Sequence, residues 1–248
     1  MISKLLLGLF LFTCLLGGCQ CPKNPFEPDV SSSGSNPGSG SGPYIPKVVY
    51  SANYDDLASG SIPSSSPENW TYSNAATAGG FWAIGPAQGS QYPAHSMPNS
   101  MQVQMSVSSG VGGAYSKSFA LNTAKDTKLD LYIQTQSAAG LGIYLVSNGL
   151  QEAGFKFQDN MPNDTFQTSS GVTIGTLVFD TVSNCVMAHL TLIWHPSTNK
   201  VDYYFQGSLA RTETVSTNVD LVSGTHLSLY TTGPGNWTSY FDDLVVTN

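Results

Sequence analysis

Apolar and polar residues alternate in many short runs along the chain after residue 47. In one run, Leu129, Leu131 and Ile133 alternate with polar neighbours. Further runs place apolar residues at every second position: Leu141, Ile143 and Leu145; Phe155 and Phe157; Leu190, Leu192 and Trp194; Val201, Tyr203 and Phe205. A period of two is typical of strands with one buried face. Turn segments rich in glycine, proline and asparagine separate the runs, and the pattern contains no convincing amphipathic helix or internal repeat. The sequence therefore predicts an all-β protein folded as one sandwich.

The N-terminal segment has a different pattern. Lys4 is followed by an apolar run over residues 5–16, then by Gly17, Gly18 and Cys19. The run is too short to span a bilayer as a helix and has the layout of a secretory signal peptide. Leu-Gly-Gly-Cys at residues 16–19 resembles the lipobox of bacterial lipoproteins. This resemblance implies a lipid on Cys19 and anchoring in the bacterial cell envelope, at the outer membrane or cell surface. The alternative is an ordinary signal peptide with a chance cysteine.

Composition divides the rest of the chain in two. Residues 19–46 are rich in proline, glycine and serine, and such a composition cannot bury enough apolar area to fold. We therefore expect a signal over residues 1–18, a tether over 19–46 and one folded domain over 47–248. The chain has 9 basic and 16 acidic residues, for a net charge of −7, and contains no basic run. This balance argues against nucleic acid as a partner and against electrostatic docking on a membrane.

Two of the four cysteines remain after the signal and the lipid site are set aside. In an exported protein Cys21 and Cys185 could form a disulfide. Because Cys21 lies in the predicted tether and Cys185 in a predicted loop or strand start, we favour two independent thiols.

The two ends of the predicted domain sharpen the fold prediction. Residues 55–60 read Asp-Asp-Leu-Ala-Ser-Gly, with Trp70 ten residues further on, and residues 240–247 read Tyr-Phe-Asp-Asp-Leu-Val-Val-Thr. These phrases resemble those that open and close the concanavalin A-like jelly rolls, and the segment over residues 194–207 resembles a hairpin of that family. The resemblance covers roughly residues 48–247 and implies a jelly-roll β-sandwich. The glutamate of the family's opening phrase falls on Ala58 and its phenylalanine on Leu57.

A structural calcium ion is also implied by this resemblance, because related jelly rolls often hold calcium between the opening phrase and the closing strand. The ligands would come from Asp55 or Asp56 and from Asp242 or Asp243. Strict alternation in the closing strand puts one of the last two carboxylates on the core-facing row, where an unpaired charge is costly. The alternative is a carboxylate that caps nearby backbone amides without an ion.

No catalytic residue is predicted. The glutamates after the signal (Glu27, Glu68, Glu152 and Glu213) do not form the paired carboxylates of jelly-roll glycosidases. The single arginine, Arg211, is in no phrase that matches an alginate lyase, and no Gly-x-Ser-x-Gly elbow occurs. His189 and His195 are about 20 Å apart on an extended strand, so they cannot bind one metal ion and are expected at the surface.

Aromatic side chains opposite the apolar rows are the candidates for ligand binding. Alternation points them outward, and rings of this kind with nearby amides form saccharide platforms. The predicted carbohydrate-binding residues are Trp82, Tyr132, Tyr144, Tyr204 and Trp237. The alternative is that the tyrosines only fill cross-strand positions of a sheet. We assign Trp70 and Trp194 to the core, and residues 159–164 to a solvated turn or a ligand rim.

These observations favour a lipoprotein whose jelly roll binds glycans and has no catalytic activity. A structural or adhesive domain that binds proteins, or a divergent polysaccharide-degrading enzyme, remains the alternative.

Overall fold

The computed structural model describes most of the predicted domain. The described residues are 46–52, 60–61, 70–73, 78–84, 100–107, 112–122, 124–137, 141–147, 150–160, 163–178, 187–215, 225–231 and 235–248. The predicted signal, Cys19, Cys21, Asp55, Asp56 and Cys185 lie outside them.

The described chain forms two antiparallel sheets. Sheet A contains nine strands: β1 (Val48–Ala52), β2 (Gly60–Ser61), β4 (Ala78–Ile84), β5 (Ser100–Val107), β7 (Thr127–Ser137), β12 (Ala188–His195), β13 (Lys200–Phe205), β14 (Ser208–Thr214) and β16 (Gly235–Thr247). Sheet B contains seven: β3 (Thr71–Ser73), β6 (Gly112–Tyr115), β8 (Leu141–Ser147), β9 (Leu150–Asn160), β10 (Asn163–Thr168), β11 (Thr173–Val178) and β15 (His226–Thr231).

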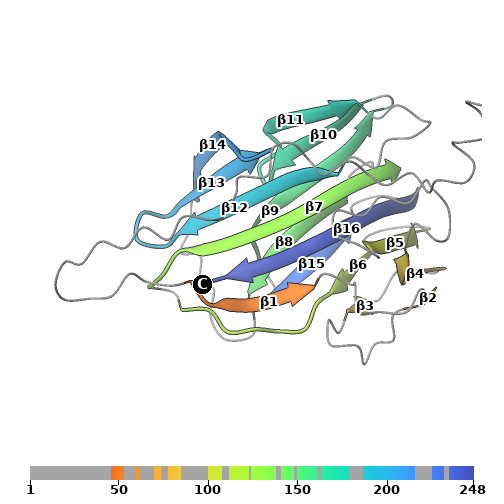
Figure 1. Cartoon of the computed structure of the whole chain (residues 1–248), viewed down its shortest axis with the longest axis horizontal. Helices are drawn as coiled ribbons and strands as arrows, with labels where there is room; N and C mark the ends of the chain where they lie inside the picture. The colour runs from red at the N-terminus through yellow and green to blue at the C-terminus, as the bar shows by residue number, and fades with distance from the viewer. Residues whose placement is uncertain are drawn as a thin grey trace, which may run out of the picture.

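Strands far apart in the sequence are neighbours in both sheets. Sheet A has the order β14-β13-β12-β7-β16-β5-β4-β2, and β1 pairs with β16 beyond the end of β5. Sheet B has the order β11-β10-β9-β8-β15-β6-β3. In Figure 1 the two sheets lie one behind the other, with their long strands running in similar directions. The prediction of an all-β sandwich is confirmed.

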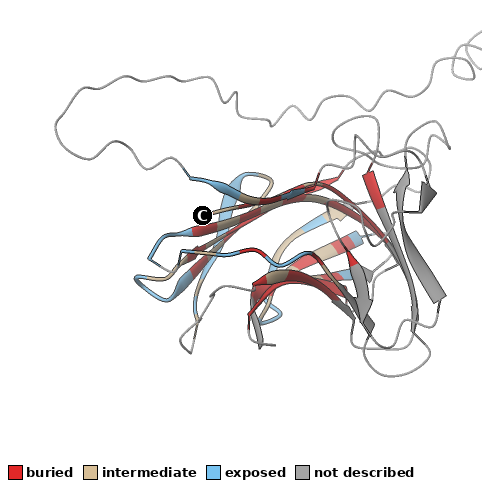
Figure 2. Ribbon diagram, turned by 90° about the horizontal axis from the view of Figure 1, so that it is seen from below, coloured by how far each residue is buried: buried red, intermediate tan, exposed pale blue. Residues whose placement is uncertain are grey.

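The core lies between the sheets, and the alternation along the strands decides which side chains enter it. Leu129, Leu131 and Ile133 of β7 are all fully buried in the core cluster. Aromatic rings contact one another across the two layers: Phe155 of β9 lies edge-on to Tyr203 of β13, with ring centroids 5.6 Å apart. Trp70 and Trp194 are buried, as predicted. Figure 2 shows these buried stretches running along both layers.

Strand β16 departs from strict alternation at the two adjacent aspartates. Phe241, Leu244 and Val246 are all fully buried, although strict alternation would put Phe241 on the opposite face from the other two. A bulge between Asp242 and Val245 reconciles them, since Asp243 has a left-handed φ of 43° and adds one extra residue to the strand. The prediction that one of these aspartates lies on the core-facing row is therefore wrong for Asp242, which is opposite the outward Tyr132. Asp242 is nevertheless fully buried.

The turn expected over residues 159–164 is also shorter than predicted. Strand β9 extends to Asn160 and β10 begins at Asn163, and Asp164 is 3% exposed. The Asp164 carboxylate accepts a hydrogen bond from Thr135 of sheet A. A polar side chain at this position therefore links the two sheets across the core instead of facing solvent.

Candidate functional site

One outward surface of sheet A gathers histidine, aspartate and tyrosine side chains from three neighbouring strands. We call it the polar face and use this name for nine side chains, namely eight outward ones of β7, β12 and β13 and that of Asp126 just before β7. Its members are Asp126, Lys128, Asp130, Tyr132, His189, Thr191, His195, Asp202 and Tyr204. Strand register brings them together, because Tyr132 is opposite His189, Asp130 is opposite Thr191, and Thr191 is opposite Tyr204.

Asp130 is the centre of a cluster of hydrogen bonds on this face. The Lys128 Nζ atom lies 2.6 Å from Asp130 Oδ2, and the His189 Nε2 atom lies 2.8 Å from Oδ1. Thr191 donates a further hydrogen bond from its hydroxyl to Oδ1. Partial burial alone would raise the pKa of the Asp130 carboxyl, but the hydrogen bonds from His189, Lys128 and Thr191 and the charge of Lys128 outweigh it and lower the pKa from 3.8 to about 2. Asp130 is therefore a charged acceptor at neutral pH, and His189 carries a proton on Nε2.

The ring of His189 also packs against an aromatic neighbour. The Tyr132 and His189 rings are stacked with centroids 4.5 Å apart and an interplanar angle of 6°. Tyr132 is half-buried, and the side chain of His189 is 20% exposed. The ring of His189 is therefore held both by the stack with Tyr132 and by its contact with Asp130.

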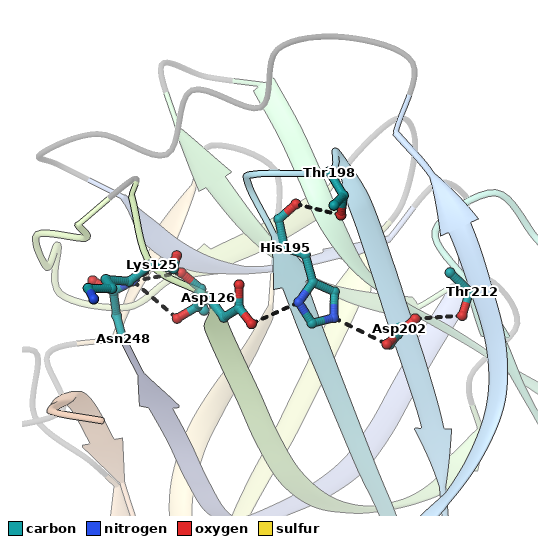
Figure 3. A network of polar contacts seen from close by, with 8 residues as sticks. Lys125, Asp126, His195, Thr198, Asp202, Thr212 and Asn248 are labelled. Atoms are coloured by element: carbon teal, nitrogen blue, oxygen red, sulfur yellow. Dashed lines mark hydrogen bonds and ion pairs between the residues drawn. The ribbon is translucent and has the colours of Figure 1, made fainter. Parts of the chain in front are cut away.

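His195 forms a second cluster at the end of β12, shown in Figure 3. Its Nδ1 atom lies 2.8 Å from Asp126 Oδ2, and its Nε2 atom lies 3.1 Å from Asp202 Oδ2. Both ring nitrogens can donate only when the imidazole is protonated. Partial burial opposes the charge, but the hydrogen bonds and charges of Asp126 and Asp202 outweigh it and raise the pKa of His195 above 6.5.

The last residue of the sequence holds the segment that carries Asp126. Asn248 donates from Nδ2 to the carbonyl oxygen of Asn122 at 3.1 Å and to the hydroxyl of Thr127 at 3.1 Å. Its backbone exchanges hydrogen bonds of 3.0 and 2.9 Å with Lys47. The position of Asp126 beside His195 thus depends on contacts with Asn248, which follows β16 and lies next to Asp126 (Figure 3).

Solved structures resemble this sandwich. A sialidase chain matches with a TM-score of 0.56 and 8% identity over 80% of this chain and 18% of that chain. The alginate lyase Aly36B matches with a TM-score of 0.46 and 12% identity over 82% of this chain and 97% of that chain. Peanut lectin matches with a TM-score of 0.45 and 11% identity over 81% of this chain and 97% of that chain. The fold is a jelly-roll β-sandwich of two antiparallel sheets.

At sequence identities this low, the resemblance to these structures concerns the fold and not the function. The chain spans less than one fifth of the length of the sialidase chain. No protein-family model and no curated protein matches the sequence.

Tyr132 and Tyr204 are the two predicted binding residues that the jelly roll brings onto the polar face. Each is partly exposed, and they lie on β7 and β13, the two strands that flank β12. Tyr144 is also opposite the core-facing row of its strand, but the expectation of an exposed ring is wrong, because it is only 4% exposed. Gly142 and Gly154 have no side chains, so the ring lies down over both: a Cβ at Gly142 would be 2.5 Å from the tyrosine Cε2 atom.

The other two predicted binding residues have only their backbone described. Strand β4 places Trp82 opposite Gln102, and β16 places Trp237 opposite Met105. Their side chains lie outside the described part of the structure, so their part in binding stays a prediction.

The structure describes half of the predicted calcium ligands. Asp242 is fully buried and its carboxylate accepts a hydrogen bond of 2.8 Å from the backbone N–H of Asp243. This is a backbone-capping contact of the kind expected without an ion. Within the described ranges, no three or more histidine, cysteine, aspartate or glutamate side chains are grouped to bind a metal. Since Asp55 and Asp56 lie outside those ranges, the calcium site stays a prediction.

Sequence reasoning missed most of the polar face. His189 and His195 were expected at the surface without a role, and each is held by aspartates. Asp130 has the same outward parity as Tyr132, which is readable from the sequence, but its partners depend on which strand pairs with β7.

In the described part of the chain, no helix is long and apolar enough to cross a membrane.

Proposed function

We propose that this protein is a lipid-anchored component of the bacterial cell envelope, attached through Cys19, whose jelly roll binds a carbohydrate without cleaving it. The polar face of sheet A is the binding surface. The single observation that carries the proposal is the stacked Tyr132–His189 pair beside the charged carboxylate of Asp130.

The chemistry of this pair matches that of a sugar ring. A pyranose presents apolar C–H groups that pack on aromatic rings, and hydroxyl groups that donate to carboxylate oxygens. Each carboxylate oxygen has two lone pairs, and Asp130 Oδ2 accepts one described hydrogen bond, from Lys128. A sugar hydroxyl can therefore add to the cluster without displacing a partner.

Ordering before binding supports the same surface. Tyr132, His189 and Asp130 are held by one another, so a ligand would not have to immobilise these side chains when it binds. Tyr204 extends the aromatic surface across β13, and its neighbour Asp202 is held by His195 and by the hydroxyl of Thr212 at 2.5 Å.

The test is polysaccharide binding by the full-length protein in detergent, measured by affinity electrophoresis against a panel of neutral, amino and acidic glycans. Tyr132→Ala should weaken binding about ten-fold or more. The variant removes one aromatic ring from the surface, and His189 loses the ring on which it stacks. Tyr115→Ala is the matched control: Tyr115 contacts His226 on the outward side of sheet B, with ring centroids 5.0 Å apart. It should leave binding unchanged.

Three results would contradict the proposal. Absence of binding to every glycan would remove carbohydrate recognition, and loss of binding in Tyr115→Ala alone would move the site to sheet B. Release of new reducing ends or unsaturated products during incubation would identify an enzyme.

A further inference from the structure

A groove runs between the edge of β1 that faces away from β16 and the segment that precedes β7. It is lined by residues 47–51 on one wall and residues 117–120 on the other, and its volume is about 490 Å³. This volume is within the roughly 300–1,000 Å³ of ligand pockets. The groove is distinct from the polar face. Its walls are β1 and the segment that follows β6, whereas the polar face lies on β7, β12 and β13.

Both walls are fixed to the sandwich. On the second wall, the backbone N–H of Ser116 donates to Leu227 at 2.9 Å and that of Phe119 donates to Thr225 at 2.8 Å, so this segment follows sheet B. On the first wall, β1 belongs to sheet A and, among the described strands, pairs only with β16. The groove therefore lies along one side of the described sandwich, between a strand of sheet A and a segment bound to sheet B.

One edge of β1 faces away from β16, and its outward backbone groups have no partner among the described strands. Lys47 and Asn248 exchange both of their backbone hydrogen bonds, and antiparallel pairs alternate between bonded and non-bonded positions. The N–H and C=O of the next residue, Val48, thus point away from β16. Its side chain is 53% exposed, so Val48 is an apolar position on this edge, with Lys47 before it and a register shift between Val48 and Tyr50 after it.

The charge of the groove is opposite to that of the whole protein. Lys47 and Lys117 are exposed on opposite walls, and neither forms an ion pair with another residue of the described ranges. Between them the floor is aromatic, with the rings of Tyr50 and Phe119 5.7 Å apart. An occupant that is extended, hydrogen-bonding along its backbone and negatively charged would satisfy all of these groups.

We propose that this groove binds an extended acidic peptide segment of a partner protein, which adds to sheet A as a strand beside β1. Its backbone pairs with the outward N–H and C=O of Val48, alternate acidic side chains face Lys47 and Lys117, and the side chains between them lie over Tyr50 and Phe119. Strand addition of this kind draws affinity from the backbone and specificity from the flanking side chains.

The experiment measures binding of a fluorescein-labelled peptide of alternating glutamate and valine to the full-length protein in detergent, by fluorescence anisotropy. The matched peptide has glutamine in place of glutamate. The acidic peptide should bind about ten-fold more tightly at low salt, and the difference should shrink in about 0.5 M NaCl, where exposed charges are screened. Lys117→Gln should weaken the binding of the acidic peptide about three-fold and leave the affinity for the glutamine peptide unchanged.

Val48→Pro tests the backbone contact directly. Proline removes an N–H that points out of the sheet, a position that edge strands tolerate, so the fold should be kept and is checked by its melting curve. The acidic peptide should lose about ten-fold in affinity in Val48→Pro and little in Val48→Ala. If Val48→Pro does not fold, Lys117→Gln and the pair of peptides still decide the question.

Equal binding of the two peptides, no binding of the acidic peptide, or wild-type affinity in Val48→Pro would each overturn the proposal. A dimer in sedimentation experiments that Val48→Pro abolishes would assign the groove to a second copy of the chain instead. Binding to phosphatidylglycerol vesicles that Lys117→Gln weakens, without peptide binding, would assign it to a lipid surface.

Discussion

Replacing Asp130 by asparagine removes one charge from the polar face and leaves the shape of the side chain almost unchanged. The native carboxylate accepts hydrogen bonds from three residues, and its pKa lies at about 2 in place of 3.8. One pKa unit corresponds to about 1.4 kcal/mol of differential interaction. Because the side chain is 25% exposed, we expect the charged form to stabilise the fold by about 2 kcal/mol at neutral pH.

The sign follows from the direction of the shift. The folded-state pKa is lower than the unfolded one, so this stability is present above pH 3.8 and is lost as the pH falls toward about 2. Urea unfolding of wild type and Asp130→Asn across this range gives the difference in unfolding free energy at each pH. The difference should be about 2 kcal/mol near pH 7 and approach zero near pH 2.

A difference in unfolding free energy that stays constant from neutral to acidic pH would refute this reasoning. The lost stability would then come from altered packing and not from the removed charge. Asp126→Asn is the matched control on the same face. The Asp126 side chain is 57% exposed, so its loss of stability should be clearly smaller.

Three further predictions concern other parts of the chain. The imidazole of His195 should titrate above pH 6.5 by NMR, and the stability advantage of wild type over His195→Gln should be present below pH 6.5 and decline as the pH rises through the higher folded-state value; an advantage independent of pH would contradict this. Labelled palmitate should attach to the wild-type chain and not to Cys19→Ser, whereas release of wild type from membranes without detergent would count against the anchor. Chelator should lower the melting temperature by several degrees if the predicted aspartate site holds calcium, and an unchanged curve with no metal in the purified protein would leave the backbone-capping contact at Asp242 as the explanation.

Strand facing was predictable for strands such as β7, because one side of the strand is buried in the core. The positions of Leu129, Leu131 and Ile133 in the core follow from a period of two, and so does the outward parity of Tyr132. The depth of a side chain does not follow from the period. Tyr144 has the predicted parity but is buried, since its ring lies over glycines of its own and the adjacent strand.

The candidate site was less predictable than the fold because it depends on pairing. Tyr132 and His189 are 57 residues apart in sequence, and only the register of β7 with β12 stacks their rings. The same holds for Asp130, whose outward parity is visible in the sequence but whose neighbours on β12 are not. A local pattern contains no information on which of many similar strands becomes a neighbour.

The extra residue in β16 also determines where the length of this strand can change. Asp243 lies where β16 stops pairing with β5 at Phe241 and begins pairing with β1 at Leu244. Deleting Asp243 would leave Phe241 and Leu244 two positions apart, and both would still face the core. A single deletion between Phe241 and Gly235 would instead reverse the facing of every side chain on one side of it. A deletion of one codon is therefore expected to be tolerated in β16 at the bulge and to be disruptive in the segment before it.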